Sequence, residues 1–86
     1  MIYKIFASPS GSRAFRKLAR EVQNYIRGEI GSLATNPTKG ERMKGEIRFL
    51  HSLHMAFSGV QYRFIYEIDE REKEIYIHYP VKSFGE

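Results

Sequence analysis

The segment from Gly59 to Asp69, GVQYRFIYEID, constrains the fold of this chain more than any other stretch of the sequence. Every second residue in it is apolar, which is the two-residue period of a β-strand with one buried face. These apolar residues are Tyr62, Phe64, Tyr66 and Ile68. Arg63 stands between two of them and is therefore expected to point away from the core. Its neighbours favour β structure, so its guanidinium is held on a stiff surface, where a fixed cation suits a phosphate group.

Three other segments show the same alternation and are also predicted to be strands: residues 2–7, 49–57 and 74–81. The segment from Ile2 to Ala7 carries apolar residues on both faces, which favours a central position in a sheet. The last three predicted strands are separated only by short turns. They are therefore expected to pair in sequence as an antiparallel meander.

A helical region is predicted between the first strand and the meander. From Arg13 to Leu33 the apolar residues recur at spacings of three and four, which is typical of an amphipathic helix. The candidates for its N-cap are Ser8, Ser10 and Ser12. Ser8 is favoured because a proline follows it at the first helical position. The pattern permits either one bent helix or a helical hairpin with its break near Ala19 and Arg20.

The predicted fold is a single α+β domain spanning residues 1–86. It has an N-terminal strand, a helical hairpin or bent helix, and a three-stranded antiparallel meander, all in one sheet with the helices on one face. The 86 residues are too few for a second core, and the absence of cysteine excludes disulfides and thiolate zinc sites. We find no signal peptide and no apolar run long enough to cross a membrane, so a cytoplasmic protein is expected. The net charge of +4 favours a polyanion or an acidic protein as partner.

The register of the meander is bounded by its short hairpins, because the apolar faces of paired strands must coincide. The residues expected to share the buried face of the central strand are Ile75, Ile77, Tyr79 and Val81 from the last strand, and Leu53, Met55 and Phe57 from the first. This matching places His78 opposite Arg63 or Ile65, and it places His54 opposite the same pair. The meander is thus expected to bring His54, Arg63 and His78 together on one polar face.

Two imidazoles beside a guanidinium form a combination that can cleave RNA. The reaction needs a base for the ribose 2′-OH, a cation for the charge on the phosphorane, and an acid for the departing 5′-oxygen. His54 and His78 suit the proton transfers, because imidazole titrates near neutral pH. Arg63 would hold the phosphate, and Lys82 is a further candidate for the acid. Either histidine alone would more often be an ordinary surface residue, so the prediction depends on their convergence.

Further residues are candidates for RNA binding. Lys44 and Arg48 could assist in holding the phosphate, and Tyr76, which falls on the polar face, could stack on a base. A zinc site made from the three histidines is disfavoured, because His51 falls on the apolar side, where it is expected to be buried or at an edge.

The chain resembles the RelE/ParE superfamily of bacterial toxin–antitoxin toxins over nearly its whole length. The resemblance depends on a first strand, a helical segment ending LATNP, a basic stretch ERMKG, the string YRFIYEID and a closing strand. It implies a small basic toxin that a cognate antitoxin neutralises. RelE-like members cleave mRNA, commonly on the ribosome and without a metal or other cofactor, so the resemblance implies mRNA as substrate.

The resemblance also implies roles for individual residues. Arg63 matches the arginine that holds the scissile phosphate, and His54 lies where nuclease members place a Lys or Arg. His78, Lys82 and Phe84 lie in the terminal region where those members carry an Arg or His followed by a Tyr. The ending VKSFGE departs from that pattern, since it contains neither Arg nor Tyr. Two alternatives therefore stand beside the endoribonuclease: a ParE-like inhibitor of DNA gyrase, and a catalytically weakened module that binds an antitoxin.

Overall fold

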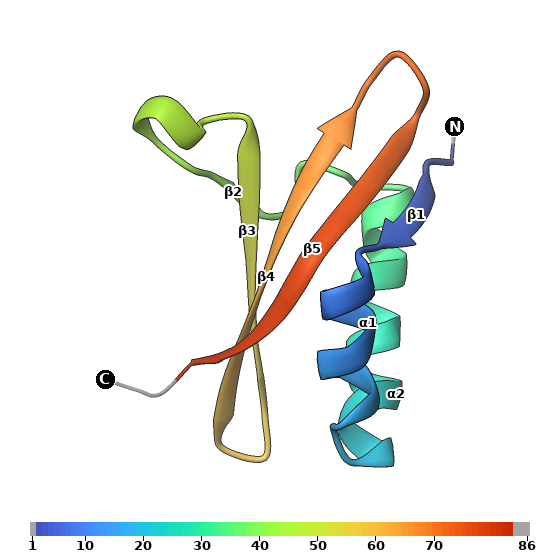
Figure 1. Ribbon diagram of the computed structural model, residues 1–86, viewed down its shortest axis with the longest axis vertical. Helices are drawn as coiled ribbons and strands as arrows, with labels where there is room; N and C mark the ends of the chain where they lie inside the picture. Colours follow the sequence, from blue (N-terminus) through green and yellow to red (C-terminus); the bar gives the residue numbers. More distant parts are fainter. Residues whose placement is uncertain (1, 84–86) are drawn as a thin grey trace.

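The computed structural model describes the backbone of residues 2–83 and the side chains of residues 2–78. Within these residues it has two helices, five strands and two 3₁₀ turns (Figure 1). The helices and strands are β1 (Lys4–Ala7), α1 (Pro9–Arg16), α2 (Arg20–Gly31), β2 (Glu41–Arg42), β3 (Leu50–Phe57), β4 (Val60–Asp69) and β5 (Glu74–Ser83). The turns are η1 (Ser32–Ala34) and η2 (Gly45–Ile47). The predicted α+β class is confirmed.

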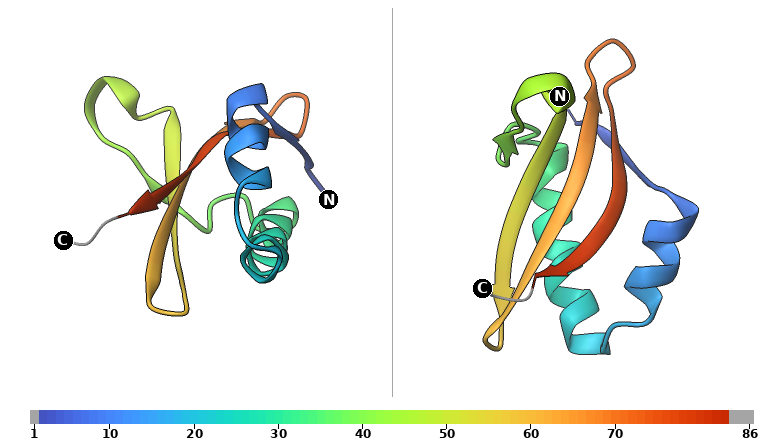
Figure 2. Two further views of the ribbon diagram at one scale, coloured as in Figure 1. Left: turned by 60° about the horizontal axis from the view of Figure 1, so that its bottom comes forward. Right: turned by 60° about the vertical axis from the view of Figure 1, so that its left-hand side comes forward.

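The five described strands form one mixed sheet in the order β1-β5-β4-β3-β2. β3, β4 and β5 are the predicted antiparallel meander, whereas β1 pairs with β5 in the parallel direction. Both helices lie on the same side of this sheet and leave its other face uncovered (Figure 2). Among residues 2–83, no helix combines the length and the apolar character needed to cross a membrane.

β1 lies at the edge of the sheet, so the predicted central position is wrong. Ile5 pairs with Ile75 and packs against the core, as its apolar character suggests. Phe6 pairs with Tyr76 on the other face, and the two rings stack with centroids 5.5 Å apart. Phe6 remains 43% exposed. The apolar residue on the outer face thus reflects stacking on one neighbouring ring, and no second strand covers it.

β2 was not predicted from the sequence, because its two residues are both charged and show no apolar alternation. It pairs with β3 through His51 and Ser52. The preceding Gly40 packs so closely on the sheet that a Cβ atom there would lie 2.7 Å from the carbonyl oxygen of Ser52. The hydroxyl of Tyr66 accepts a hydrogen bond from the Gly40 N–H at 3.0 Å and donates one to the carbonyl of Pro37 at 2.7 Å. A buried tyrosine therefore fixes this connection.

The helical region is a hairpin, which is one of the two predicted forms. Ser8 caps α1 with its Oγ, which accepts a hydrogen bond from the Gly11 N–H at 3.1 Å. The break falls just before Arg20, where Ala19 has extended backbone angles. Gln23 of α2 reaches back with its side-chain amide and donates to three carbonyl groups near the end of α1. These belong to Phe15, Arg16 and Leu18, at 2.9 to 3.3 Å. This amide satisfies carbonyls that the end of a helix would otherwise leave unpaired.

The core lies between the helices and the sheet. Its buried residues come from α2, η1 and the three long strands: they are Ile26, Leu33, Leu53, Met55, Tyr62, Phe64, Tyr66, Ile75 and Ile77. Every even-numbered residue from 62 to 66 of β4 is among them, as the two-residue period predicted. Arg63 therefore lies on the face of β4 that points away from the helices.

The pairing of β5 with β4 contains a β-bulge at His78. Up to this point the predicted register is confirmed, since Ile77 pairs with Tyr66. Beyond it the pairing shifts by one residue, so that Tyr79 pairs with Ile65 and Val81 with Arg63. The predictions that Tyr79 and Val81 pair with the buried face of β4 are wrong. The extra residue of a bulge inverts the parity of everything after it, while the apolar alternation of the sequence runs on unchanged.

Candidate functional site

Arg63 and His54 form the centre of the candidate site. They lie directly opposite each other in the β3–β4 ladder, as one of the two predicted registers required. His54 is exposed and Arg63 is partly exposed, both on the face that the helices leave free. Arg63 makes no ion pair with any described side chain. A guanidinium whose donors are not used by a neighbouring carboxylate can give them to a phosphate.

A buried serine positions the imidazole of His54. Ser52 lies two residues earlier on the same face of β3, is only 5% exposed, and places its Oγ 3.3 Å from His54 Nε2. Because the serine is held between β2 and β4, it offers a fixed partner to the ring. Ser52 was not among the site residues predicted from the sequence. Its position at i−2 from His54 on the same strand face is the signal that could have identified it.

His78 does not pair with Arg63, whose partner in β5 is Val81. Its place at the bulge sets its side chain toward β4, where Nε2 lies 3.2 Å from Oε1 of Glu67. Of the two predicted positions for His78, opposite Arg63 or opposite Ile65, the structure is nearer to the second, and the bulge moves the side chain toward Glu67. His78 lies on the same open face but one step along β4, toward Ile65 and Glu67.

His78 lines a small hollow on the open face of the sheet. The hollow has a volume of about 270 Å³ and is lined by Phe49, Leu50, Ile65, Glu67 and His78. Two of its walls are unusual for an open sheet face. Ile65 is only 9% exposed although it alternates with the polar Arg63 and Glu67, and Phe49 is 56% exposed although it is aromatic. The sequence analysis missed this hollow, yet the isoleucine between two charged residues of β4 is a signal of it.

The predicted RNA-binding residues lie at the far end of the open face from Arg63. Lys44 and Arg48 flank η2 in the connection from β2 to β3, and both are exposed. His54 lies four positions along β3 from Leu50, which is at that end, and this corresponds to about 13 Å of strand. These cations therefore do not join Arg63, but Arg48 precedes Phe49, which lines the hollow.

Tyr76 lies on the open face, as predicted, and is 38% exposed. One side of its ring is covered by Phe6, and its hydroxyl donates a hydrogen bond to Glu74. This hydrogen bond, with smaller contributions from burial and the nearby acidic groups, raises the pKa of Tyr76 to about 12. The tyrosine stays protonated at neutral pH and can offer one free ring face for stacking.

Two predicted residues fall partly or wholly outside the described part of the chain. The backbone of Lys82 pairs with Tyr62, next to the row of Arg63, but its side chain is not among those described. Phe84 lies outside the described residues altogether.

His51 lies on the opposite face of the sheet from the candidate site, as predicted. It is 7% exposed and stacks on Tyr66 with ring centroids 5.3 Å apart. Burial and, to a smaller extent, the nearby charge of Arg42 lower the pKa of His51. Its Nδ1 has no hydrogen-bond partner among the described groups. Among the described residues, no three histidine or acidic side chains come together as a metal site requires.

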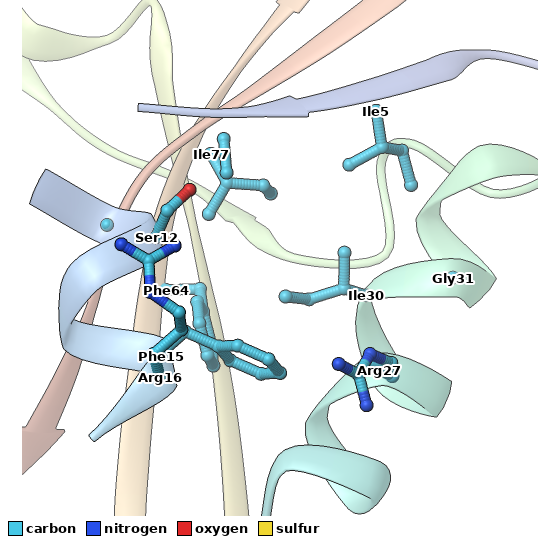
Figure 3. Close-up of a pocket in the computed structure, with 11 residues that line it drawn as sticks. Ile5, Ser12, Phe15, Arg16, Arg27, Ile30, Gly31, Phe64 and Ile77 are labelled. Carbon is cyan, nitrogen blue, oxygen red and sulfur yellow. The ribbon is translucent and has the colours of Figure 1, made fainter. Parts of the chain in front are cut away.

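A larger groove lies on the helix side of the sheet (Figure 3). Its floor is apolar and comes from Ile5, Phe64 and Ile77, while Phe15 of α1 and Ile30 of α2 face it from the two helices. The groove has a volume of about 550 Å³ and leaves part of the core open between the helices.

The rim of this groove is basic. Arg16 of α1 and Arg27 of α2 stand on either side of it, and the Arg27 guanidinium lies 5.2 Å from the centre of the Phe15 ring. No described carboxylate pairs with either arginine. An apolar channel between two cations is suited to a segment that is both apolar and acidic.

Comparison with known proteins agrees with this architecture. Residues 5–81 match a family model described as the ParE-like toxin of type II bacterial toxin–antitoxin systems. No curated protein sequence shows significant similarity to the chain.

Three solved structures illustrate the shared fold. The isolated RelE toxin of E. coli superposes with a TM-score of 0.81 at 15% identity, over 98% of this chain and 87% of that one. The toxin–antitoxin complex RelBE2 of Mycobacterium tuberculosis gives 0.77 at 21% identity, over 96% of this chain and all of that one (100%). The intact RelBE complex of E. coli gives 0.79 at 14% identity, over 96% and 99%.

Proposed function

We propose that this chain, which belongs to the ParE-like toxins of type II bacterial toxin–antitoxin systems, is an endoribonuclease toxin that inhibits translation by cleaving mRNA on the ribosome. The observation that carries this proposal is the pairing of Arg63 with His54 on the open face of the sheet. An imidazole directly opposite a guanidinium without a described ion-pair partner supplies two of the three groups that cleavage through a ribose 2′-OH requires.

In the proposed reaction Arg63 binds the scissile phosphate through charge-assisted hydrogen bonds. His54 accepts the proton of the 2′-OH, and the oxygen attacks the adjacent phosphorus. The bond to the 5′-oxygen breaks, leaving a 2′,3′-cyclic phosphate on one product and a 5′-hydroxyl on the other. Arg63 stabilises the charge on the equatorial oxygens of the phosphorane. Ser52 keeps the His54 ring in place from 3.3 Å.

The acid that protonates the leaving oxygen is assigned to β5. Val81 pairs with Arg63, and the two residues proposed from the sequence, His78 and Lys82, lie on either side of it in the chain. Lys82 follows Val81 directly in the chain, and His78 lies on the open face beside Glu67. Lysine donates a proton as an ammonium, so either residue can serve.

The toxin is proposed to be neutralised by a cognate antitoxin that occupies the helix-side groove. Two of the solved relatives are toxin–antitoxin complexes, which supports a protein partner of this kind. The apolar floor and the cations Arg16 and Arg27 fit an acidic amphipathic helical segment, with its apolar side on Phe64 and Ile77.

A gyrase inhibitor is the second candidate, and the family model itself favours it, because the description names ParE-like toxins. Such a toxin requires no proton-transfer pair. A DNA supercoiling assay with purified gyrase separates the two functions: the nuclease proposal expects supercoiling to continue at toxin concentrations that stop growth.

The proposal is tested by induced expression of the wild type and of Arg63→Ala. The wild type should arrest growth with mRNA cut at defined positions, and Arg63→Ala should do neither while remaining folded. Arg71→Ala is the matched control, since Arg71 is an exposed arginine in the turn after β4 and lies outside the site. Normal cleavage by Arg63→Ala would remove the arginine from the mechanism, and growth arrest without cut mRNA would favour the gyrase function.

A further inference from the structure

The hollow beside the candidate site is a place where RNA sequence could be read. Its residue Ile65 lies two positions from Arg63 on the same face of β4, which corresponds to about 7 Å. A nucleotide whose phosphate contacts Arg63 can therefore place its own base, or that of its neighbour, over the hollow. The cation of Arg48, next to Phe49 in the chain, adds attraction for the RNA backbone at the other side.

The walls of the hollow suit a flat aromatic ligand. Leu50 and Ile65 are apolar, and Phe49 is 56% exposed on a face that no described element covers. Exposed aromatic rings on a sheet surface are common stacking platforms for the bases of single-stranded nucleic acids. The volume of about 270 Å³ accommodates a single base.

The polar wall selects among the bases. Glu67 presents carboxylate oxygens, which only accept hydrogen bonds, and the imidazole of His78 holds one of them at 3.2 Å. Both side chains remain about 40% exposed, at 42% and 41%, so the carboxylate is accessible from the hollow. On its Watson–Crick edge guanine offers two adjacent N–H donors, whereas adenine, cytosine and uracil each set acceptors beside a single donor group. A carboxylate fixed in position pairs with two adjacent donors in the same way as it pairs with a guanidinium.

We propose that this hollow is a nucleobase subsite in which Phe49 stacks on a guanine and Glu67, positioned by His78, accepts hydrogen bonds from its N1–H and amino groups. The inference rests on the proposed RNA-cleaving function, because it names the base that lies next to the phosphate bound by Arg63. Arg48, which precedes Phe49 in the chain, would then bind the RNA backbone next to the subsite.

The test measures binding separately from cleavage. The full chain is titrated with guanosine 5′-monophosphate and with the adenosine, cytidine and uridine monophosphates, and the resonances of Phe49, Ile65 and His78 are followed by NMR. The guanosine nucleotide should shift these resonances at a concentration about tenfold lower than the other three require, as expected for one bidentate base contact. Glu67→Gln, which keeps the shape but changes one acceptor to a donor, should abolish the preference.

Two outcomes overturn the subsite: equal binding of all four nucleotides, or shifts confined to the neighbourhood of Arg63. Arg63→Ala separates the subsite from the catalytic proposal, because it should leave the guanine preference of the hollow in place while cleavage is lost. If the protein cuts RNA without regard to guanine and Glu67→Gln changes nothing, the subsite is wrong and the nuclease stands. If guanine binds at Phe49 but no RNA is cut, the nuclease is wrong and the base site stands.

Discussion

The hydroxyl of Ser8 donates a hydrogen bond to the carbonyl oxygen of His78, at the bulge of β5. The backbone N–H of Ser8 donates to the neighbouring carbonyl of Ile77 at 3.0 Å, and the same hydroxyl accepts from Gly11 at the start of α1. One residue at the end of β1 thus begins a helix and satisfies two carbonyls of the bulge that shifts the register of β5. The geometry around His78 depends on it.

Ser8→Ala is expected to lower the free energy of unfolding by about 1–2 kcal/mol, since it removes an N-cap together with a hydrogen bond to the bulge. Urea denaturation measures the change. Ser10→Ala is the control, because Ser10 is exposed and lies in the first turn of the same helix; it should change the stability by less than about 0.5 kcal/mol. Equal effects of the two substitutions would contradict the role of Ser8.

Gly40→Ala and Gly28→Ala should have opposite effects on stability. A Cβ at Gly40 would meet the Ser52 carbonyl at 2.7 Å and the Tyr66 hydroxyl at 2.8 Å, so a loss of about 1–3 kcal/mol is expected. Gly28 lies exposed within α2 with nothing within 4 Å of the new atom, and alanine there should add about 0.5–1 kcal/mol through helix propensity. Thermal unfolding of both variants checks the pair, and a Gly40→Ala variant as stable as the wild type would contradict the close packing.

His51 should make the protein less stable in mild acid. Burial lowers its pKa below the ordinary value of 6.5, so the unfolded chain takes up a proton at a higher pH than the folded one. The contribution of neutral His51 to the free energy of unfolding is fully present above pH 6.5. It decreases as the pH falls from 6.5 toward the lowered pKa, because the unfolded state then binds more protons. His51→Leu should flatten this part of the curve of unfolding free energy against pH. An unchanged slope in the variant would assign the acid sensitivity to other groups.

His54→Ala should lower the rate of RNA cleavage by about 10²–10⁴-fold, which is the usual contribution of a general base. Its side chain is exposed, so the free energy of unfolding should change by less than about 0.5 kcal/mol. Single-turnover cleavage of an RNA oligonucleotide measures the loss, with Arg71→Ala as a variant of an exposed residue outside the site. Full activity of His54→Ala would show that His54 is not the general base of the reaction.

Reversing the charge at the rim of the groove should weaken antitoxin binding. Arg16→Glu and Arg27→Glu are each expected to slow association with the cognate antitoxin and to reduce the dependence of the rate on salt. Arg71→Glu makes the same change of charge outside the groove and should leave the rate nearly unchanged. Equal slowing by all three variants would indicate attraction to the net charge of the chain alone.

The sequence was sufficient to predict the helical region, the strands β1, β3, β4 and β5, and the pairing of His54 with Arg63. The alternation around Arg63 predicted its outward direction, and the short hairpin to β3 placed His54 opposite it. The pairing of His78 could not be predicted, because a bulge leaves the apolar alternation intact while it shifts every later partner. The edge position of β1 could not be predicted either, since an apolar Phe6 that stacks on Tyr76 gives the same sequence pattern as burial on both faces.

The hollow and the groove depend on tertiary arrangement. Phe49 and Ile65 come together with Glu67 only when β3 and β4 have paired, so no local pattern marks them as one surface. The groove exists because α1 and α2 diverge over the sheet, and helical periodicity gives no information on the distance between two helices. One sign of the hollow in the sequence is Ile65, which alternates with the charged residues Arg63 and Glu67 of β4.

The parallel pairing of β1 with β5 has a consequence for synthesis in the cell. Lys4 pairs with Glu74, which lies far along the chain. The edge strand β1 therefore has no partner until β5 has left the ribosomal exit tunnel. Until then neither the bulge nor its serine is in place, and the open face cannot take its final shape. The sheet therefore closes only after the chain has been made as far as β5, so the candidate site is completed late in synthesis.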